Sequence, residues 1–451
     1  MNRFSKRTFL IFGLVFLGSC LGFSSRDKDA SADAASDGEA EKAACSEYSD
    51  GDSYTQLKYL SSSVVMGLGS CASETQTCTC SNGVVSCTGT YTESACSTTT
   101  AALAAGDILV MHEYTESVSG PTPLGNQGHI LAFSKDGAFK GVAFENKSGS
   151  SSLMRYPRGM ALQRDPFANE FYLLVGTADA DLKMDVLKFP EMITSSSTGV
   201  VLSEPSRLNS LVGPSENSLF DFGFTPISGG KFYNTTVVSN APVINFYDFS
   251  SGTTTGPNSC NVEYSGAFAG WRLQALWNGI RTFGFNYILA LRSNSSGFAV
   301  DKITNCTDGG VDPSPTALFI ESLSDAKGMD VFEFRDGPTP HGTWDQDILV
   351  TITPRLGGVS TVFRYDNDGS GNYSLDSSPF QNDARAAFYF SDMQNGVRKK
   401  IITLEDDGAS RHLRRYDHQG NLDATLYSTN VDDVLPESTS GLGVWMVQLP
   451  E

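Results

Sequence analysis

Residues 159–189 decide the fold, because they contain three short apolar strands in succession: Gly159-Met160-Ala161-Leu162, Phe171-Tyr-Leu-Leu-Val-Gly-Thr177 and Met184-Asp-Val-Leu-Lys-Phe189. These runs are rich in β-branched and aromatic residues, which favour strands. The same order of strand types returns along the chain, with first strands beginning near residues 159, 219, 271, 328 and 387. A repeat of roughly 52 to 60 residues has room for four strands and their loops, which is the size of a propeller blade.

Incomplete pieces of this repeat stand at both ends of the region. Asp107-Ile-Leu-Val-Met111 matches a second strand but lacks a first, whereas Gly441-Leu-Gly-Val-Trp-Met-Val447 matches a first strand but lacks a second. An isolated strand leaves backbone groups unpaired, so we predict that the C-terminal strand pairs near residue 107. The predicted fold class is all-β, a six-bladed β-propeller closed by the C-terminal strand. An open pair of β-sandwiches is the alternative, but it does not explain the period.

The N-terminus has the charge pattern of an export signal. Three basic residues precede the apolar run 9–17, which is too short for a permanent membrane-spanning helix. The run ends in Leu17-Gly18-Ser19-Cys20. This tetrapeptide resembles the lipobox of bacterial lipoproteins, in which cleavage precedes a cysteine that is then acylated. A cleaved ordinary signal with a chance cysteine is the alternative.

The lipobox resemblance implies a cellular location. It makes residues 1–19 a lipoprotein signal peptide and Cys20 the lipid attachment site, with palmitate among its acyl chains. More than one acyl chain gives stable attachment to a membrane. Leu21 follows the cysteine, instead of the Asp associated with retention in the inner membrane. The expected location is therefore the outer membrane, on its periplasmic face or at the cell surface.

Two segments separate the lipid site from the repeats. Residues 20–56 are acidic and poor in large apolar side chains before Tyr48, which predicts a disordered tether. Residues 57–100 are dense in cysteine, which predicts a small disulfide-stabilised module. This module resembles small secreted modules of the thrombospondin-repeat type, although the tryptophans of that family are missing. Residues 101–451 form the predicted propeller domain.

The cysteine count agrees with export. Nine cysteines less Cys20 leave eight, an even number, as expected in an oxidising compartment. We expect three disulfides within the clustered six and one between the other two, with the pairing inside the cluster left open. Zinc is a poor alternative, because no CxxC or neighbouring His completes a tetrahedral set. The clustered candidates are Cys45, Cys71, Cys78, Cys80, Cys87 and Cys96, and the separate ones are Cys260 and Cys306.

Basic residues recur at the starts of the first strands. They are Arg158, Arg272, Lys327 and Arg385. In a propeller these positions meet near one mouth of the channel, where they could bind a carboxylate, phosphate or sulfate. The alternative is that each one pairs with an acid of a neighbouring blade, such as Asp325 or Asp383.

The segment 366–377 has the spacing of an EF-hand calcium loop. Its candidate metal ligands are Asp366, Asp368, Ser370 and Asn372. The twelfth position is Ser377, however, where a calcium loop of this type carries a bidentate Glu. A hairpin turn between third and fourth strands is the simpler interpretation.

The run 157–161, with the strands 169–175 and 186–189, resembles the NHL and SMP-30-like six-bladed propellers. That superfamily includes binding scaffolds and calcium-dependent lactonases, in which Glu, Asn and Asp side chains hold calcium in the channel. Residues of these types at the inner-strand entrances are Glu216, Asn217, Asn278, Asp325, Asp383 and Glu437. The cations at the same entrances oppose a divalent metal there, and fold alone does not establish function.

We therefore predict an envelope-anchored lipoprotein whose propeller is a binding or scaffolding module for a protein or small-molecule partner. No catalytic residue and no cofactor are predicted, apart from the possible Ca²⁺ site. A calcium-dependent propeller hydrolase, similar to a lactonase or esterase, is the alternative. The formal net charge of -19 at pH 7 repels phosphate backbones, so we expect no nucleic-acid partner.

Overall fold

A computed structural model describes most of the chain that carries the repeats. The described residues are 45, 47–112, 129–145, 156–165, 170–178, 184–211, 222–224, 231–238, 241–250, 253–262, 272–279, 287–294, 297–304, 311–312, 316–321, 326–335, 344–352, 361–367, 372–375, 383–390, 400–406, 410–417, 420–430 and 444–450. Their regular structure consists of β-strands, so the predicted all-β class is confirmed. No helix in these ranges has the length and apolar character needed to cross a membrane.

The chain forms two compact units, which we describe separately. The first takes Met1–Gln56 and Gln76–Gly89, and the second takes Leu57–Thr75 and Thr90–Glu451. β1 (Ser53–Tyr59) begins inside the segment 20–56, where the sequence predicts a tether. It belongs to a three-stranded sheet of order β1-β3-β4, which also contains β3 (Ser73–Ser81) and β4 (Val84–Cys87).

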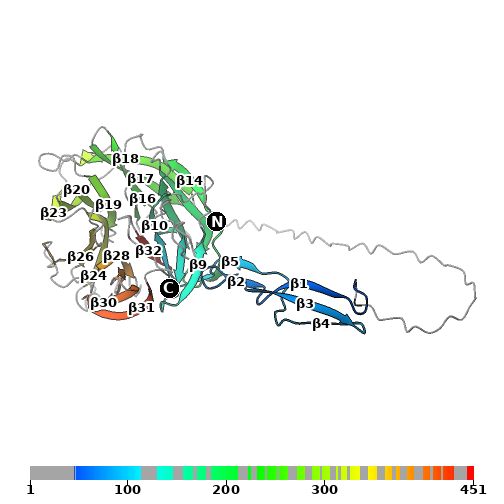
Figure 1. Cartoon of the computed structure of the whole chain (residues 1–451). Helices are drawn as coiled ribbons and strands as arrows, with labels where there is room; N and C mark the ends of the chain where they lie inside the picture. The colour runs from blue at the N-terminus through cyan, green and yellow to red at the C-terminus, as the bar shows by residue number, and fades with distance from the viewer. Residues whose placement is uncertain are drawn as a thin grey trace, which may run out of the picture. The chain divides into compact units, whose positions relative to one another are not determined.

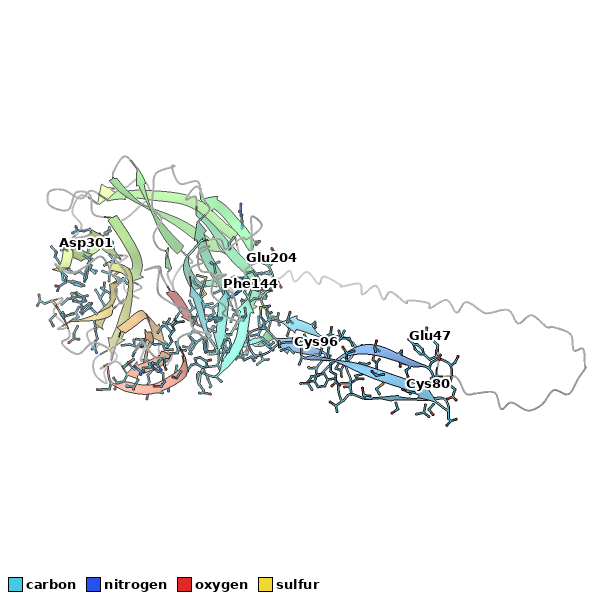
Figure 2. All side chains as sticks on the ribbon, in the orientation of Figure 1. Glu47, Cys80, Cys96, Phe144, Glu204 and Asp301 are labelled. Atoms are coloured by element: carbon cyan, nitrogen blue, oxygen red, sulfur yellow. A yellow bond between two sulfur atoms is a disulfide. The ribbon has the colours of Figure 1, made fainter. Side chains whose placement is uncertain are left out.

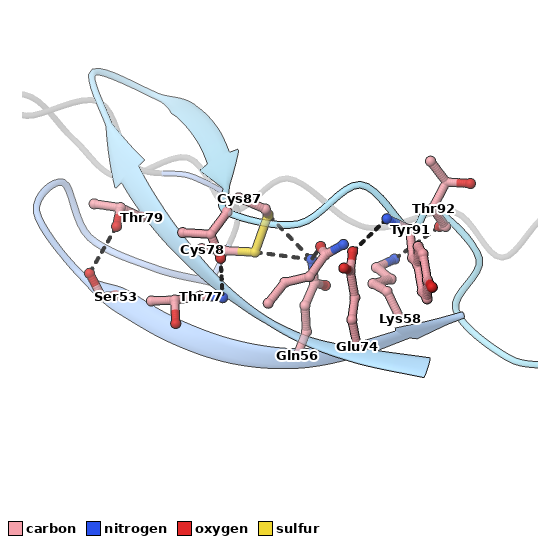
Figure 3. Close-up of a disulfide and its surroundings, with 12 residues drawn as sticks. Ser53, Gln56, Lys58, Glu74, Thr77, Cys78, Thr79, Cys87, Tyr91 and Thr92 are labelled. Carbon is pink, nitrogen blue, oxygen red and sulfur yellow. Dashed lines mark hydrogen bonds between the residues drawn. A yellow bond between two sulfur atoms is a disulfide. The ribbon is translucent and has the colours of Figure 1, made fainter. Parts of the chain in front are cut away.

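Disulfides hold the first unit together. Cys45 bonds to Cys80, and Cys78 bonds to Cys87 across the β3-β4 hairpin. Asn82 and Gly83 turn this hairpin with φ angles of 52° and 78°, as a two-residue Asn-Gly turn requires. Gln56 Nε2 donates hydrogen bonds to Cys78 Sγ at 3.0 Å and to Cys87 Sγ at 3.3 Å (Figure 3). The unit is thus stabilised by covalent bonds more than by an apolar core.

The third disulfide lies in the second unit, where Cys71 bonds to Cys96. All six clustered cysteines are therefore paired with one another, as predicted. Oxidised in this way, their sulfurs cannot act as the thiolate ligands of zinc. Close by in the same unit, Glu74 Oε1 accepts hydrogen bonds from the backbone N–H groups of Thr90 and Tyr91, both at 2.6 Å (Figure 3).

The second unit repeats one sheet order (Figure 1). Its described strands form antiparallel four-stranded meanders, and one sheet gains a short fifth strand. The first sheet consists of β32 (Val444–Gln448), β7 (Ile108–His112), β8 (Ile130–Phe133) and β9 (Phe139–Phe144), and the second consists of β10 (Tyr156–Asp165), β11 (Glu170–Ala178), β12 (Met184–Ile193) and β14 (Ser206–Leu211). The third sheet consists of β15 (Phe222–Phe224), β16 (Lys231–Val238), β17 (Ala241–Ser250), β18 (Thr253–Val262) and β22 (Val311–Asp312), and the fourth consists of β19 (Arg272–Gly279), β20 (Tyr287–Asn294), β21 (Gly297–Thr304) and β23 (Thr316–Glu321). The fifth sheet consists of β24 (Ala326–Arg335), β25 (Trp344–Ile352), β26 (Thr361–Asn367) and β27 (Tyr373–Leu375), and the sixth consists of β28 (Asp383–Phe390), β29 (Lys400–Asp406), β30 (Ser410–Asp417) and β31 (Leu422–Asn430). This succession of separate four-stranded meanders is β-propeller architecture.

The first strands of these sheets are neighbours in space. Contacts join β32 to β10, β10 to β15, β15 to β19, β19 to β24, β24 to β28, and β28 to β32. The C-terminal strand β32 pairs antiparallel with β7, with Val444 opposite His112 and Gln448 opposite Ile108. The two ends of the repeat region therefore meet in one sheet.

Apolar side chains fill the space between several adjacent sheets. Leu109 and Met111 of β7 pack in one cluster with Leu173 and Val175 of β11. The alternate residues of β7, Ile108 and Val110, pack in another cluster with Ile402 and Leu404 of β29. A sheet buried on both faces in this way has apolar residues at successive positions, which explains the unbroken run Ile108–Met111.

Short strand pairs complete the described second unit. β2 (Ser63–Val65) pairs in parallel with β5 (Ser97–Thr99), and β6 (Leu103–Ala104) pairs with β13 (Thr198–Val200). β22 lies between β21 and β23 in the chain but pairs in parallel with β18 of the preceding sheet. None of these pairs was predicted, because strands of two or three residues have no readable period.

Candidate functional site

Three of the four predicted channel-mouth cations share one structural position, a β-bulge near the start of a first strand. The register between first and second strands shifts at Arg158 in β10, at Lys327 in β24 and at Arg385 in β28. A bulged residue has no partner in the backbone ladder, and it bends the strand locally. Bulges are frequent at the rims of closed β structures and beside active sites, where they change the direction of a side chain.

The fourth cation, Arg272, has a different position. It is the first residue of β19 and lies opposite Ser293, whereas the bulge of this strand falls at Gln274. A small residue follows the bulge in each of these four strands, namely Gly159, Ala275, Gly328 and Ala386. The sequence pattern does not indicate Gln274, because this residue is uncharged and only the strand register identifies its position.

The four bulges lie at one end of the first strands. Arg158, Gln274 and Arg385 are third in their strands, and Lys327 is second. These strands hold the same place in sheets of the same order, and the contacts described above make them neighbours in a succession. The fold therefore places three cations and one amide residue at equivalent points of the same rim.

Of the residues suggested by the lactonase resemblance, the two that the structure describes are not brought together in this way. Asn278 is the seventh of eight residues in β19, whereas Asp383 is the first residue of β28. Because equivalent first strands run in the same direction, these two residues lie toward opposite ends. Glu216, Asn217, Asp325 and Glu437 lie outside the described residues.

A buried polar cluster lies beside one bulge. Glu405 pairs in register with Ala384, the residue before Arg385, and its side chain is fully buried. Its Oε1 accepts hydrogen bonds from Thr403 Oγ1 at 2.6 Å and from the Tyr416 hydroxyl, and its Oε2 accepts one from Arg414 Nη1. This set of donors satisfies a carboxylate that burial would otherwise destabilise.

The cluster changes the acidity of its members. Burial and then the hydrogen bond to Glu405 raise the pKa of Tyr416 above its usual 10.0. Burial alone would lower the pKa of Arg414, but the hydrogen bond and negative charge of Glu405 raise it. Tyr416 is therefore held neutral and Arg414 charged. Glu405 therefore acts here as the shared acceptor that holds these two side chains in place.

A second buried ion pair lies in another sheet, also opposite the residue that precedes the bulge of the first strand. Arg292 pairs in register with Leu273, the residue before the Gln274 bulge, and its guanidinium bonds to Asp301 with Nη2–Oδ1 at 3.1 Å. Asp301 is labelled in Figure 2. Both side chains are buried, with 2% and 1% of their surface exposed. Their sequence signal is a charge that directly follows an apolar run: Arg292 follows Tyr287–Leu291, and Asp301 follows Phe298–Val300.

The calcium candidates are only partly described. Asp366 is an exposed residue of β26 and lies 3.8 Å from Arg364 Nη2. Asn372 precedes β27, and Asp368 and Ser370 lie outside the described residues. β26 and β27 pair antiparallel, with Asn367 opposite Tyr373, so the segment connects the third and fourth strands of its sheet as predicted. The described residues contain no group of three His, Cys, Asp or Glu that could hold a metal.

The remaining predicted sites are mostly beyond the described residues. Cys20 and Cys306 are among those not described. Cys260 lies in β18, next to Asn261, which pairs with Val311 of β22. Cys306 is five residues before Val311 in the chain, which is compatible with the predicted Cys260–Cys306 disulfide. That disulfide stays a prediction.

Comparisons with known proteins give structural likenesses without a family. No protein-family model and no curated protein matches the chain. An endo-arabinase from Bacteroides thetaiotaomicron is 15% identical with a TM-score of 0.39, covering 58% of this chain and 95% of its own. A six-bladed fucose-binding lectin from Aleuria aurantia is 11% identical with a TM-score of 0.39, covering 82% and 94%.

A third structure, a putative 6-phosphogluconolactonase from Bacteroides uniformis, is 13% identical with a TM-score of 0.36, covering 72% of this chain and 83% of its own. At these scores the likenesses carry no conclusion about a ligand or a reaction. The functional argument rests on this chain's own residues.

Proposed function

We propose that this chain is an exported lipoprotein, acylated at Cys20, whose propeller is a closed six-bladed ring that binds a small-molecule or protein partner at the envelope. The observation that carries the binding role is the recurrence of a bulge at one end of four first strands. Bulges are over-represented at rims and beside active sites, where they change the direction of a side chain, so their recurrence at matching positions supports a binding rim.

Ring closure supports the same proposal. The C-terminal strand β32 contacts both β28 and β10 while it pairs with β7. Such a strand completes the first sheet and gives β7 a partner along an edge that would otherwise be unpaired. A closed ring holds its inner strands rigidly, which is what a preorganised binding site needs.

The anchoring is tested by substitution at the acylation site. A Cys20→Ala variant should lose incorporation of labelled palmitate and move from the membrane pellet to the soluble fraction of lysed cells. A Ser24→Ala variant is the matched control and should stay with the membrane. Membrane attachment of Cys20→Ala at the level of the parent protein would refute the lipoprotein assignment.

Metal analysis tests the binding role against the hydrolase alternative. The proposal predicts that protein purified without added metal holds no stoichiometric calcium. It also predicts that a chelator does not alter the protein's interaction with its partner. One tightly held calcium per chain, lost together with an esterase or lactonase activity, would contradict the binding module.

A further inference from the structure

We infer that the rim formed by the bulges is a binding site for an oxyanion group, a carboxylate, sulfate or phosphate, carried by a small soluble ligand. The inference rests on the proposed binding function and names its ligand class. Its basis is that the residues at the bulges are basic in three of the four strands, Arg158, Lys327 and Arg385. The fourth, Gln274, adds an amide donor.

The composition of the chain makes this coincidence informative. Lys and Arg number 32 of 451 residues, so a basic residue at any given position is uncommon. Basic residues occupy three of the four equivalent bulges, which is far more often than this composition predicts. Arginine and lysine supply the charge-assisted hydrogen bonds that hold oxyanions, and arginine can bind them in a bidentate manner.

Beside two of the bulges, the structure describes acids that are already engaged with other partners. At the register position before the Arg385 bulge, Glu405 already accepts bonds from Thr403, Arg414 and Tyr416. At the corresponding position before the Gln274 bulge stands a cation, Arg292, which is ion-paired with Asp301. The described acids nearest these two bulges in register are thus already engaged with other partners.

The overall charge restricts the size of the ligand. The protein carries a formal charge of -19, which repels a long polyanion at many points of its surface. A small anion avoids most of this repulsion, because charges farther than about 10 Å are screened at ordinary salt. We therefore assign the site to a small ligand and not to an acidic polysaccharide chain.

Isothermal titration calorimetry on the full chain, purified in detergent, tests the inference with sodium sulfate, sodium phosphate and citrate as probes. At least one probe should bind saturably, with one site per chain and a Kd on the order of 1 mM for a simple anion. Dextran sulfate is the polymer arm and should bind no more tightly per chain than sulfate. Saturable binding of the polymer alone, or of no probe, would overturn the inference.

Matched variants locate the site. The triple variant Arg158→Gln, Lys327→Gln, Arg385→Gln should lose binding, and each single change should weaken it about tenfold, as expected for a hydrogen bond to a charged group. The control triple Lys135→Gln, Arg207→Gln, Lys302→Gln removes the same charge from exposed positions away from the bulges. If both triple variants weaken binding of the anion equally, the anion is attracted by net charge alone, and the assignment of the site is wrong.

A gain-of-function variant keeps the test valid if the triple variant does not fold. Gln274→Arg should tighten binding of the same probe about tenfold, and Gln274→Glu should weaken it. Unchanged affinity in both would contradict the inference. Because calorimetry in detergent does not depend on acylation, a negative result here leaves the lipid anchor standing, and a failed Cys20 test leaves the oxyanion site standing.

Discussion

The side-chain amide of Gln448 donates a hydrogen bond to the backbone carbonyl of Gly106 at 3.0 Å, although 342 residues separate them in the chain. Two backbone bonds extend the junction, from Leu449 N–H to Asp107 O at 2.8 Å and from Gly106 N–H to Pro450 O at 3.2 Å. Closing a loop of this length costs about 5 kcal/mol of chain entropy plus a constant. Such a pairing is formed only when the intervening sheets are in place, so it should be highly cooperative with them.

Asp107 should be important for this junction. Its carboxylate accepts a hydrogen bond from the backbone N–H of Ala104 at 2.7 Å and pairs with Lys140, and the residue is only 3% exposed. Asp107→Ala should lower the free energy of unfolding by about 2 to 4 kcal/mol, because it leaves a donor and a partly buried cation without their acceptor. Urea unfolding monitored by tryptophan fluorescence measures this. Asp136→Ala, at an exposed turn position, is the control and should change stability by less than about 0.5 kcal/mol.

The Glu405 cluster should make stability fall in alkaline solution. Burial raises the pKa of Tyr416 above 10.0, so between pH 10 and that raised value the unfolded chain releases a proton that the folded chain retains. The stabilisation is complete below pH 10 and is lost as the pH rises above it, by up to about 1.4 kcal/mol per pH unit. Tyr416→Phe should reduce the slope of unfolding free energy against pH above 10. Tyr48→Phe, at a residue that is 36% exposed and outside the Glu405 cluster, is the control for loss of a tyrosine hydroxyl. A slope in Tyr416→Phe equal to that of the parent protein would contradict the prediction.

The disulfides of the first unit should stabilise it without stabilising the second. The Cys45–Cys80 and Cys78–Cys87 bonds span 35 and 9 residues. Loop-closure entropy gives them about 4 and 2.5 kcal/mol respectively. The variant Cys45→Ala, Cys80→Ala should therefore become susceptible to limited proteolysis within residues 45–56 and 76–89, read by mass spectrometry, while fragments from residue 101 onward stay intact. If the variant resists proteolysis as well as the parent protein does, apolar contacts hold the first unit together without this disulfide.

Most strand positions could be predicted from the sequence, because most first, second and third strands of the sheets are strongly apolar. The run Leu173–Val175 and the run Ile401–Leu404 are buried between sheets, as their composition indicates. Fourth strands were harder to place. β31 (Leu422–Asn430) is mostly polar, and its exposed and half-buried positions over 422–428 do not alternate regularly, so its pattern resembles that of a loop.

The candidate site was predicted only in part. The recurrence of Arg158, Lys327 and Arg385 is visible in the sequence, but their placement at bulges depends on register, which apolar patterns do not specify to one residue. The buried pair Arg292–Asp301 depends on which strands become neighbours in space. The pairing of the clustered cysteines could not be predicted either, since six cysteines allow 15 connectivities.

The thermal midpoint of a chain lacking residues 444–451 tests the central claim, that β32 closes the ring, most directly. Met446, Val447 and Leu449 are at most 5% exposed, so their burial alone contributes about 5 kcal/mol, which corresponds to roughly 10 °C or more in a domain of this size. The midpoint is followed by near-UV circular dichroism, with deletion of Glu451 alone as the matched control. The account predicts a midpoint lower by at least about 10 °C, or loss of the cooperative transition, in the longer deletion only. An unchanged midpoint would show that the strand is a dispensable tail and would contradict closure of the ring.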